Sequence, residues 1–112
     1  MLVPLLALAI LAPTDKGSTL YTDCKAFVAM LNGNAKQEYS VAASAFRCAG
    51  YVDGIMDGAD GLRGFCASNA STGTIVRVYI AYMDKNPKMF DEREGTGFMS
   101  ALQEAYPCPM KR

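Results

Sequence analysis

Four cysteines are the residues of this chain with the clearest chemical potential: Cys24, Cys48, Cys66 and Cys108. No two of them form the C-x-x-C pair that zinc sites use, and the chain contains no histidine that could complete a metal site. Without histidine, a cysteine also lacks the usual partner that lowers a thiol pKa for nucleophilic catalysis. An even number of cysteines in a short chain is instead typical of a disulfide framework. We therefore predict two structural disulfides.

Three carboxylates, Asp53, Asp57 and Asp60, recur at the spacing that places side chains on one face of a helix. Paired carboxylates can act as general acid and general base. A calcium-binding loop, however, needs oxygen ligands at alternate positions, a glycine and a late glutamate, and this spacing does not match. We interpret the three as a solvated or partner-facing stripe. The sequence predicts no catalytic residue, no metal site and no cofactor, and the protein is predicted not to be an enzyme.

Length and composition restrict the class of protein further. The chain has 112 residues, which suffice for one domain. Its 11 basic and 11 acidic residues cancel, so no surplus of positive charge favours a nucleic-acid partner. Hydrophobic residues make up 51% of the chain, which is too large a share for a disordered protein.

Residues 1–12 are apolar throughout. This run is too short for a transmembrane helix, which needs about 20 residues, and it matches the apolar region of a secretory signal peptide. We predict that residues 1–19 are a signal peptide or apolar N-terminal leader, and that no membrane span remains after its removal. Together with the even number of cysteines, the leader predicts export to an oxidising compartment, the periplasm.

Apolar residues recur with the helical period in four segments, and none shows the alternation of a strand. Thr22 and Asp23 are predicted to cap the first helix, and Pro87 is predicted to end the third. Gly95 and Gly97 disfavour helix, so we expect the first turns of the fourth helix to be loose or absent. The sequence therefore predicts an all-α protein, a small four-helix domain of two antiparallel helical hairpins. Its segments are residues 23–31, 40–58, 72–86 and 88–106.

The predicted hairpins favour one pairing of the cysteines over its two rivals. Cys24 and Cys48 lie equally far from a turn near residue 36, so they are level in the first hairpin. Cys66 enters the third helix and Cys108 follows the fourth, so both lie at one end of the second hairpin. We predict the bridges Cys24–Cys48 and Cys66–Cys108.

Three glycines, Gly50, Gly54 and Gly58, recur every fourth residue and so line one face of the second predicted helix. The interleaved Asp53 and Asp57 exclude a membrane-spanning role for this helix. We predict that the glycines allow close approach of a neighbouring helix within the chain. A contact between two copies of the chain is the alternative.

Two blocks of residues, Cys48-Ala-Gly-Tyr-Val-Asp-Gly54 and Ala105-Tyr-Pro-Cys108, resemble those of the Rap/Tai family of type VI secretion immunity proteins. The resemblance spans residues 20–109, and we assign residues 20–112 to a Rap/Tai-like helical domain. It implies a small periplasmic protein that binds and blocks a cognate effector, a peptidoglycan amidase delivered by a neighbouring cell. It also admits a homodimer, as is frequent in that family.

The loop after the second predicted helix is the segment that we expect to enter the cleft of the effector. An inhibitor without catalytic groups must obtain its affinity from its contact surface. Leu62 offers an apolar anchor, and the polar side chains of Asp57, Asp60 and Arg63 can form charge-assisted hydrogen bonds. The charged residues 88–96 are a second candidate segment.

Two other functions fit the same sequence. One is a periplasmic acid-stress chaperone of the HdeA kind, which is also small, helical and disulfide-bonded. Such a protein exposes hydrophobic surface when its carboxylates become protonated. The other is an exported binding protein of a different, uncharacterised kind. A hydrolase gene beside this one would favour the immunity function over both.

Overall fold

Helices account for nearly all the regular structure of the protein. The computed structural model describes residues 15–33 and 39–109. These residues form α2 (Gly17–Leu31), α3 (Tyr39–Ala59), α4 (Thr72–Lys85) and α5 (Glu94–Ala105), with a 3-10 helix, η1 (Pro87–Asp91), before α5. Within the described ranges there is no strand, only two isolated β-bridges. The prediction of an all-α, four-helix protein is confirmed.

The predicted leader, residues 1–19, falls largely outside the described part of the chain. Its last residues, from Asp15 onwards, are described and lead directly into α2. Among the helices of the described residues, none is long and apolar enough to cross a membrane. The leader and its removal stay predictions.

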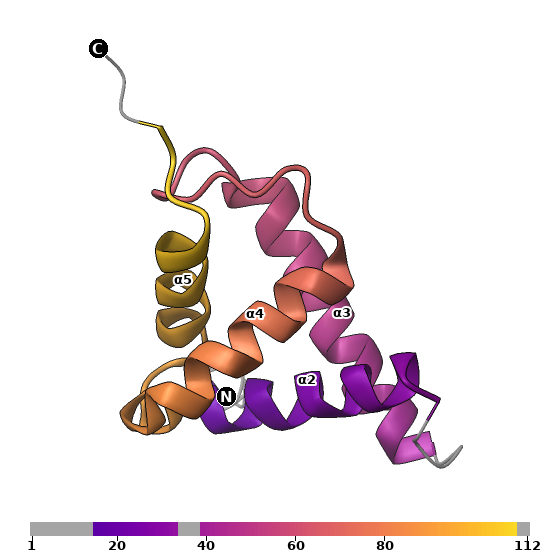
Figure 1. Ribbon diagram of the computed structural model, residues 1–112. Coiled ribbons are helices and arrows are strands. Elements are labelled where there is room, and N and C mark those ends of the chain that lie inside the picture. Colours follow the sequence, from indigo (N-terminus) through magenta and orange to yellow (C-terminus); the bar gives the residue numbers. More distant parts are fainter. Residues whose placement is uncertain (1–14, 34–38, 110–112) are drawn as a thin grey trace, which may run out of the picture.

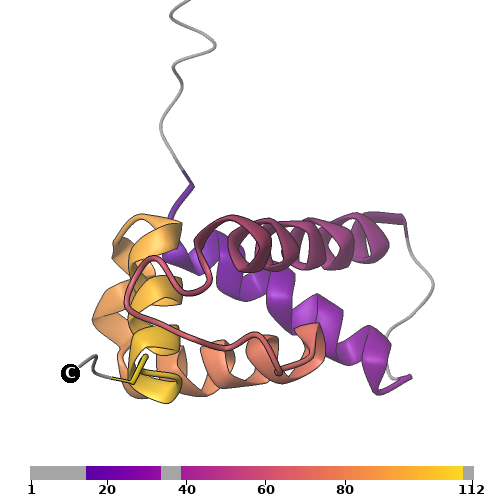
Figure 2. The ribbon, with the colours of Figure 1, turned by 90° about the horizontal axis from the view of Figure 1, so that it is seen from above.

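The four helices form two successive hairpins, α2 with α3 and α4 with α5. Figure 1 shows α2 along the base of the molecule, with the other three helices extending away from it. α2 contacts each of the other helices as well as η1. Figure 2 shows α3 along one outer side of the molecule and α4 along the opposite side. One side of α3 therefore faces outwards along its whole length.

The core lies where the helices meet the loop that follows α3. Phe98 is at its centre: the rings of Tyr51 and Tyr79 each lie 5.5 Å from it between centroids, that of Tyr51 edge-on. The Tyr79 hydroxyl donates a hydrogen bond of 3.3 Å to the carbonyl oxygen of Gly17, which satisfies this buried polar group. Other large, fully buried side chains come from every α-helix and from the loop: Leu20, Val52, Phe65, Ile75, Met83 and Leu102.

The start of α2 differs from the prediction. Thr22 and Asp23 do not cap the helix but lie inside it, and no side chain caps its actual start at Gly17. Instead, the Gly17 amide donates to the carbonyl oxygen of Glu92 at 2.8 Å. This bond supplies a partner for one of the amides that a helix start leaves free. A segment from the other end of the chain therefore sets the first turn.

The start of α5 also differs from the prediction. The α-helix begins at Glu94, so the first turns of the predicted segment are absent as α-helix, but Gly95 and Gly97 themselves lie within the regular helix. A Cβ atom on Gly97 would lie only 2.7 Å from the Met83 sulfur, so the missing side chain lets α5 pack against α4. Most of residues 88–94, predicted as the first part of this helix, form η1 and the link after it. Packing thus outweighs the low helix propensity of glycine here.

The glycines of α3, unlike Gly97 of α5, make no close contact with a neighbouring helix of the described residues. Among residues 15–33 and 39–109, no atom of a neighbouring element lies within 4 Å of a Cβ built on Gly50, Gly54 or Gly58, so the prediction that they admit a neighbouring helix within the chain is wrong. Close approaches occur on other helices, for example at Gly73, whose Cβ would lie 3.2 Å from Leu31. The three α3 glycines face open space.

Both predicted disulfides are present. Cys24–Cys48 joins α2 to α3, and Cys66–Cys108 joins the loop after α3 to the segment after α5. The Cα atoms of the two pairs lie 5.0 and 4.9 Å apart. Cys24 and Cys48 are fully buried, whereas Cys66 is exposed. The level positions inferred from the hairpins are therefore confirmed.

Candidate functional site

The loop between α3 and α4, residues 60–71, places the sequence-predicted contact residues at one end of the molecule (Figure 1). Leu62 is the most exposed large hydrophobic side chain of this loop, at 77%. Phe65 is fully buried in the core. The loop therefore presents an apolar tip while an apolar residue close behind it holds the base.

Two glycines shape the tip of this loop. Gly61 and Gly64 have φ angles of 80° and 83°, in the left-handed region that favours glycine. The Gly61 amide donates to the carbonyl oxygen of Phe65 at 2.8 Å, and the Leu62 amide donates to that of Ala59 at 2.9 Å. The turn that carries Leu62 is therefore closed by its own backbone hydrogen bonds.

The C-terminal end of the chain holds the other side of the loop. The Cys66 amide donates to the carbonyl oxygen of Tyr106 at 2.8 Å, next to the Cys66–Cys108 disulfide. The side-chain amide of Gln103, on α5, donates to the carbonyl oxygen of Arg63 at 2.7 Å. These bonds fix the loop before any partner arrives, which lowers the entropy lost on binding.

The predicted contact residues divide into two groups. Leu62 and Arg63 lie at the exposed tip, and Asp57 is exposed on the last turns of α3. Asp60, in contrast, is half-buried, and its carboxylate accepts a hydrogen bond of 2.6 Å from the Ala67 amide. Asp60 therefore positions the loop, and the other three side chains are available for contacts.

A polar pocket of about 490 Å³ adjoins the loop. The three carboxylates of the predicted stripe, Asp53, Asp57 and Asp60, come together on its wall. Asp53 accepts a hydrogen bond of 2.7 Å from the Thr72 hydroxyl. The remaining lining residues are Met56, Ser68, Ala70 and Thr72. The pocket thus presents acidic groups beside the apolar tip of the loop.

The chemistry that these groups offer is that of a contact surface. In the part of the chain that the structure describes, no cluster of three or more metal-ligating side chains is close enough to hold an ion. All four cysteines are joined in disulfides. What the site presents is an apolar anchor, one guanidinium and an acidic pocket, which can recognise a partner through burial and charged hydrogen bonds.

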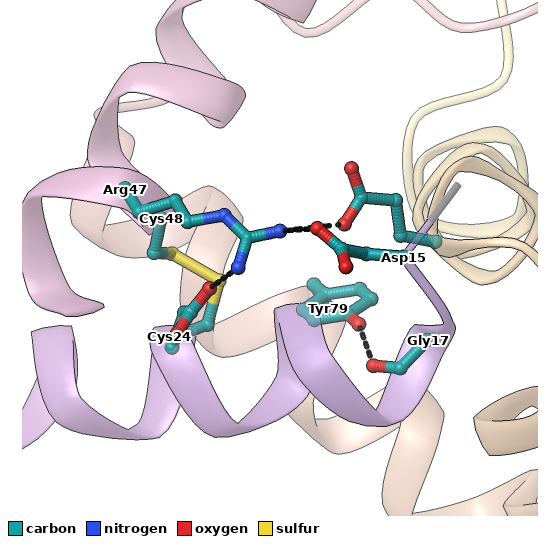
Figure 3. Close-up of polar contacts among 8 residues, drawn as sticks. Asp15, Gly17, Cys24, Arg47, Cys48 and Tyr79 are labelled. Carbon is teal, nitrogen blue, oxygen red and sulfur yellow. Dashed lines mark hydrogen bonds and ion pairs between the residues drawn. A yellow bond between two sulfur atoms is a disulfide. The ribbon is translucent and has the colours of Figure 1, made fainter. Parts of the chain in front are cut away.

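The second candidate segment, residues 88–96, belongs to a different part of the molecule. Its Glu94 joins a cluster of charged residues around Arg47 that sequence reasoning did not find. Figure 3 shows the Arg47 side chain next to the Cys24–Cys48 disulfide, extending towards Asp15. The cluster joins α2, α3 and α5, so Glu94 of this segment contributes to the fold.

Arg47 contacts three carboxylates from separate parts of the chain. It pairs with Asp15, which precedes α2, with Asp23 of α2 at 3.1 Å, and with Glu94 of α5 at 3.4 Å. Asp23 is only 6% exposed, so Arg47 compensates a carboxylate removed from water. One sequence signal points to this pair, because Asp23 and Arg47 each precede a cysteine of the same disulfide.

Burial shapes the electrostatics of this cluster. Loss of solvent raises the pKa of Glu94 above its ordinary value, Arg47 acts in the opposite direction, and the carboxylates of Asp15 and Asp23 raise it further. One guanidinium thus faces three carboxylates, and Glu94 releases its proton less readily in the folded protein than in the unfolded chain.

Comparison with known proteins assigns the chain to a family. A family model described as Rap1a immunity proteins matches residues 16–108, which include all four helices and both disulfides. No curated protein and no solved structure matches the chain significantly. Because the family match spans most of the sequence, this chain belongs to the Rap1a immunity protein family.

Proposed function

We propose that the protein is a periplasmic immunity protein that binds and blocks a type VI secretion effector, and that this effector is a peptidoglycan amidase. Membership of the Rap1a immunity protein family supports the inhibitory role. The structural observation that carries the proposal is the rigid loop that exposes Leu62 at 77%. An exposed apolar side chain on a preorganised loop is the kind of anchor that dominates binding energy.

In the proposed complex, the loop enters the active-site cleft of the effector and excludes its substrate. Leu62 fills an apolar pocket, which contributes about 2 kcal/mol from burial of the side chain. Arg63 and Asp57 flank Leu62 and form charge-assisted hydrogen bonds to polar groups at the rim. Asp60 acts indirectly, because its carboxylate holds the loop through the Ala67 amide.

Export supports the same proposal. An effector that cuts peptidoglycan acts outside the cytoplasm, so its inhibitor must be present there. The apolar leader and the two disulfides are both typical of proteins in an oxidising compartment. The leader supplies the route, and the disulfides form after transfer.

The experiment tests the loop against the proposed effector, a peptidoglycan hydrolase to be identified among the genes beside this one. We expect Leu62→Ala to weaken inhibition of that hydrolase about tenfold or more, because the variant loses most of the anchor. Leu31→Ala is the matched control, since Leu31 is 50% exposed at the end of α2, away from the tip of the loop. Inhibition unchanged by Leu62→Ala in a folded variant would exclude this loop from the mechanism.

A further inference from the structure

The Cys66–Cys108 disulfide lies at the surface, beside a hollow of the molecule. Cys66 is exposed and Cys108 is half-buried, whereas Cys24 and Cys48 of the other bridge are both fully buried. A pocket of about 380 Å³ opens next to Cys66. A molecule that carries a thiol can therefore approach one bridge from solvent, while packed helices cover the other.

The side chains that line this pocket are uncharged. Besides Cys66, they belong to Ala67, Ser68, Asn69, Ala70 and Tyr106. Most of them are small, so they leave room for an incoming group. A thiolate, which is the reactive form of a thiol, meets no negative charge on these walls. The Asp60 carboxylate accepts a hydrogen bond from the Ala67 amide but does not line the pocket.

The helical core does not contain this bridge. With the exception of Phe65, the largest fully buried side chains belong to the helices, and the buried bridge joins α2 to α3. The loop and the segment after α5 lie together at one end of the molecule (Figure 1). Besides the bridge, hydrogen bonds from the Cys66 amide to Tyr106 and from the Gln103 side chain to the loop hold them. Opening the bridge therefore loosens the loop and leaves the helices in place.

We propose that Cys66–Cys108 is a site of thiol–disulfide exchange with a redox protein that carries two neighbouring thiols, and that the exchange releases the loop. A thiolate of this dithiol attacks the sulfur of Cys66, the more exposed of the two residues. The Cys66–Cys108 bond breaks, a mixed disulfide forms, and Cys108 leaves as a thiolate that takes up a proton.

The second thiol of the redox protein completes the reaction. It loses its proton, attacks the sulfur of its neighbour in the mixed disulfide and releases Cys66, which takes up a proton. Two electrons thus pass from the dithiol, which becomes a disulfide, to the protein, which gains two thiols. An oxidised partner of the same class reverses the sequence and ties the loop again.

Release changes the position of the loop more than the shape of its tip. The turn that carries Leu62 is closed by its own backbone hydrogen bonds, which the exchange leaves intact. The base of the loop loses its covalent tie, so ordering the loop against a partner then costs more entropy. Weaker inhibition of the effector follows from this and rests on the proposed function, whereas the exchange itself does not.

Stepwise reduction of the purified, folded protein tests the site without any effector. Dithiothreitol is added in the absence of denaturant, samples are quenched with iodoacetamide, and peptide mapping locates the alkylated cysteines. We expect Cys66 and Cys108 to be alkylated about tenfold faster, or more, than Cys24 and Cys48. The intermediate should keep its helical circular dichroism and show faster amide exchange over residues 61–70. Loss of both bridges at one rate, earlier loss of Cys24–Cys48, or unchanged amide exchange in the intermediate would overturn the proposal.

A trapping experiment tests which sulfur is attacked. Thioredoxin whose second active-site cysteine is replaced by serine cannot resolve a mixed disulfide, so the covalent complex accumulates. We expect peptide mapping of this complex to find thioredoxin linked to Cys66. Linkage to Cys108, or to a cysteine of the buried bridge, would contradict the proposed order of the reaction.

A charge at the pocket tests the path of approach. Ser68 is exposed and lines the pocket, so Ser68→Glu should slow reduction by dithiothreitol several-fold and Ser68→Lys should speed it. Both effects should shrink as salt is added. Ser18→Glu is the matched control, because Ser18 is exposed in the first turn of α2, and it should leave the rate unchanged. Equal rates for the two Ser68 variants would show that the thiolate does not enter through this pocket.

Discussion

The two disulfides lie in regions of contrasting character. Cys24–Cys48 is fully buried between α2 and α3, beside the Arg47 cluster. Cys66–Cys108 lies at the surface, where it ties the contact loop to the end of the chain. The same covalent bond thus supports the core in one region and preorganises a surface in the other. What a disulfide contributes depends on what surrounds it.

Loop length and burial give opposite answers to which of the two disulfides stabilises the fold more. The surface bridge spans 42 residues and the buried one 24, so the entropy of the unfolded chain favours the surface bridge by about 0.5 kcal/mol. Removing buried sulfur atoms also leaves a cavity, which costs on the order of 1–3 kcal/mol. The cavity term is larger, and the buried bridge should therefore stabilise the fold more.

The largest expected effect follows from that ranking. Cys24→Ala with Cys48→Ala should lower the free energy of unfolding by about 5 kcal/mol, and Cys66→Ala with Cys108→Ala by about 3 kcal/mol. Urea denaturation of both double variants measures the difference. The surface variant should also show faster amide exchange over residues 61–70 and weaker inhibition of the proposed effector. A larger loss of stability in the surface variant would show that chain entropy outweighs burial here.

A smaller effect is expected at the charged cluster of the buried region. Arg47→Gln leaves the buried Asp23 carboxylate without its cation and should lower the free energy of unfolding by about 2 kcal/mol, less than for a fully buried pair because Arg47 is partly exposed. Arg77→Gln is the matched control: Arg77 is exposed and, among the described residues, donates a hydrogen bond to Asn32, so the change should stay within about 0.5 kcal/mol. Equal urea midpoints for the two variants would show that the cluster does not stabilise the fold.

The smallest expected effect is a dependence on pH at Glu94. Its pKa is raised in the folded protein, so between pH 4.5 and that raised pKa the folded state binds more protons than the unfolded state. Stability from this group therefore falls as pH rises through this window, and Glu94→Gln should remove that dependence. Thermal melting of both proteins from pH 4 to pH 7 measures it. A carboxylate that opens an acid-stress chaperone on acidification would have to contribute stability that falls as the pH falls, which is the opposite of the dependence expected for Glu94.

Much of the fold follows from local sequence patterns. The apolar period and the Asn86–Pro87 stop predict α4, and Ser71 caps the helix by accepting a hydrogen bond from the Thr74 amide. The pairing of the cysteines follows because antiparallel hairpins place residues at equal distances from a turn side by side. The exposed position of the loop that carries Leu62 also follows, since glycine-rich polar segments run over the surface. Each of these properties depends on residues close together in the chain.

Only the tertiary structure decides the remaining features, because they depend on which distant segments meet. α2 begins at Gly17 because its amide reaches Glu92, and α5 accommodates Gly97 because Met83 occupies the adjacent space. Asp60 holds the loop because the Ala67 amide lies within reach of its carboxylate. The glycines of α3 have the same local pattern whether a helix covers them or not. Only the packing of the helices shows that these glycines face outwards. The spacing of residues along the chain specifies a face of the helix, but it does not specify what lies against that face.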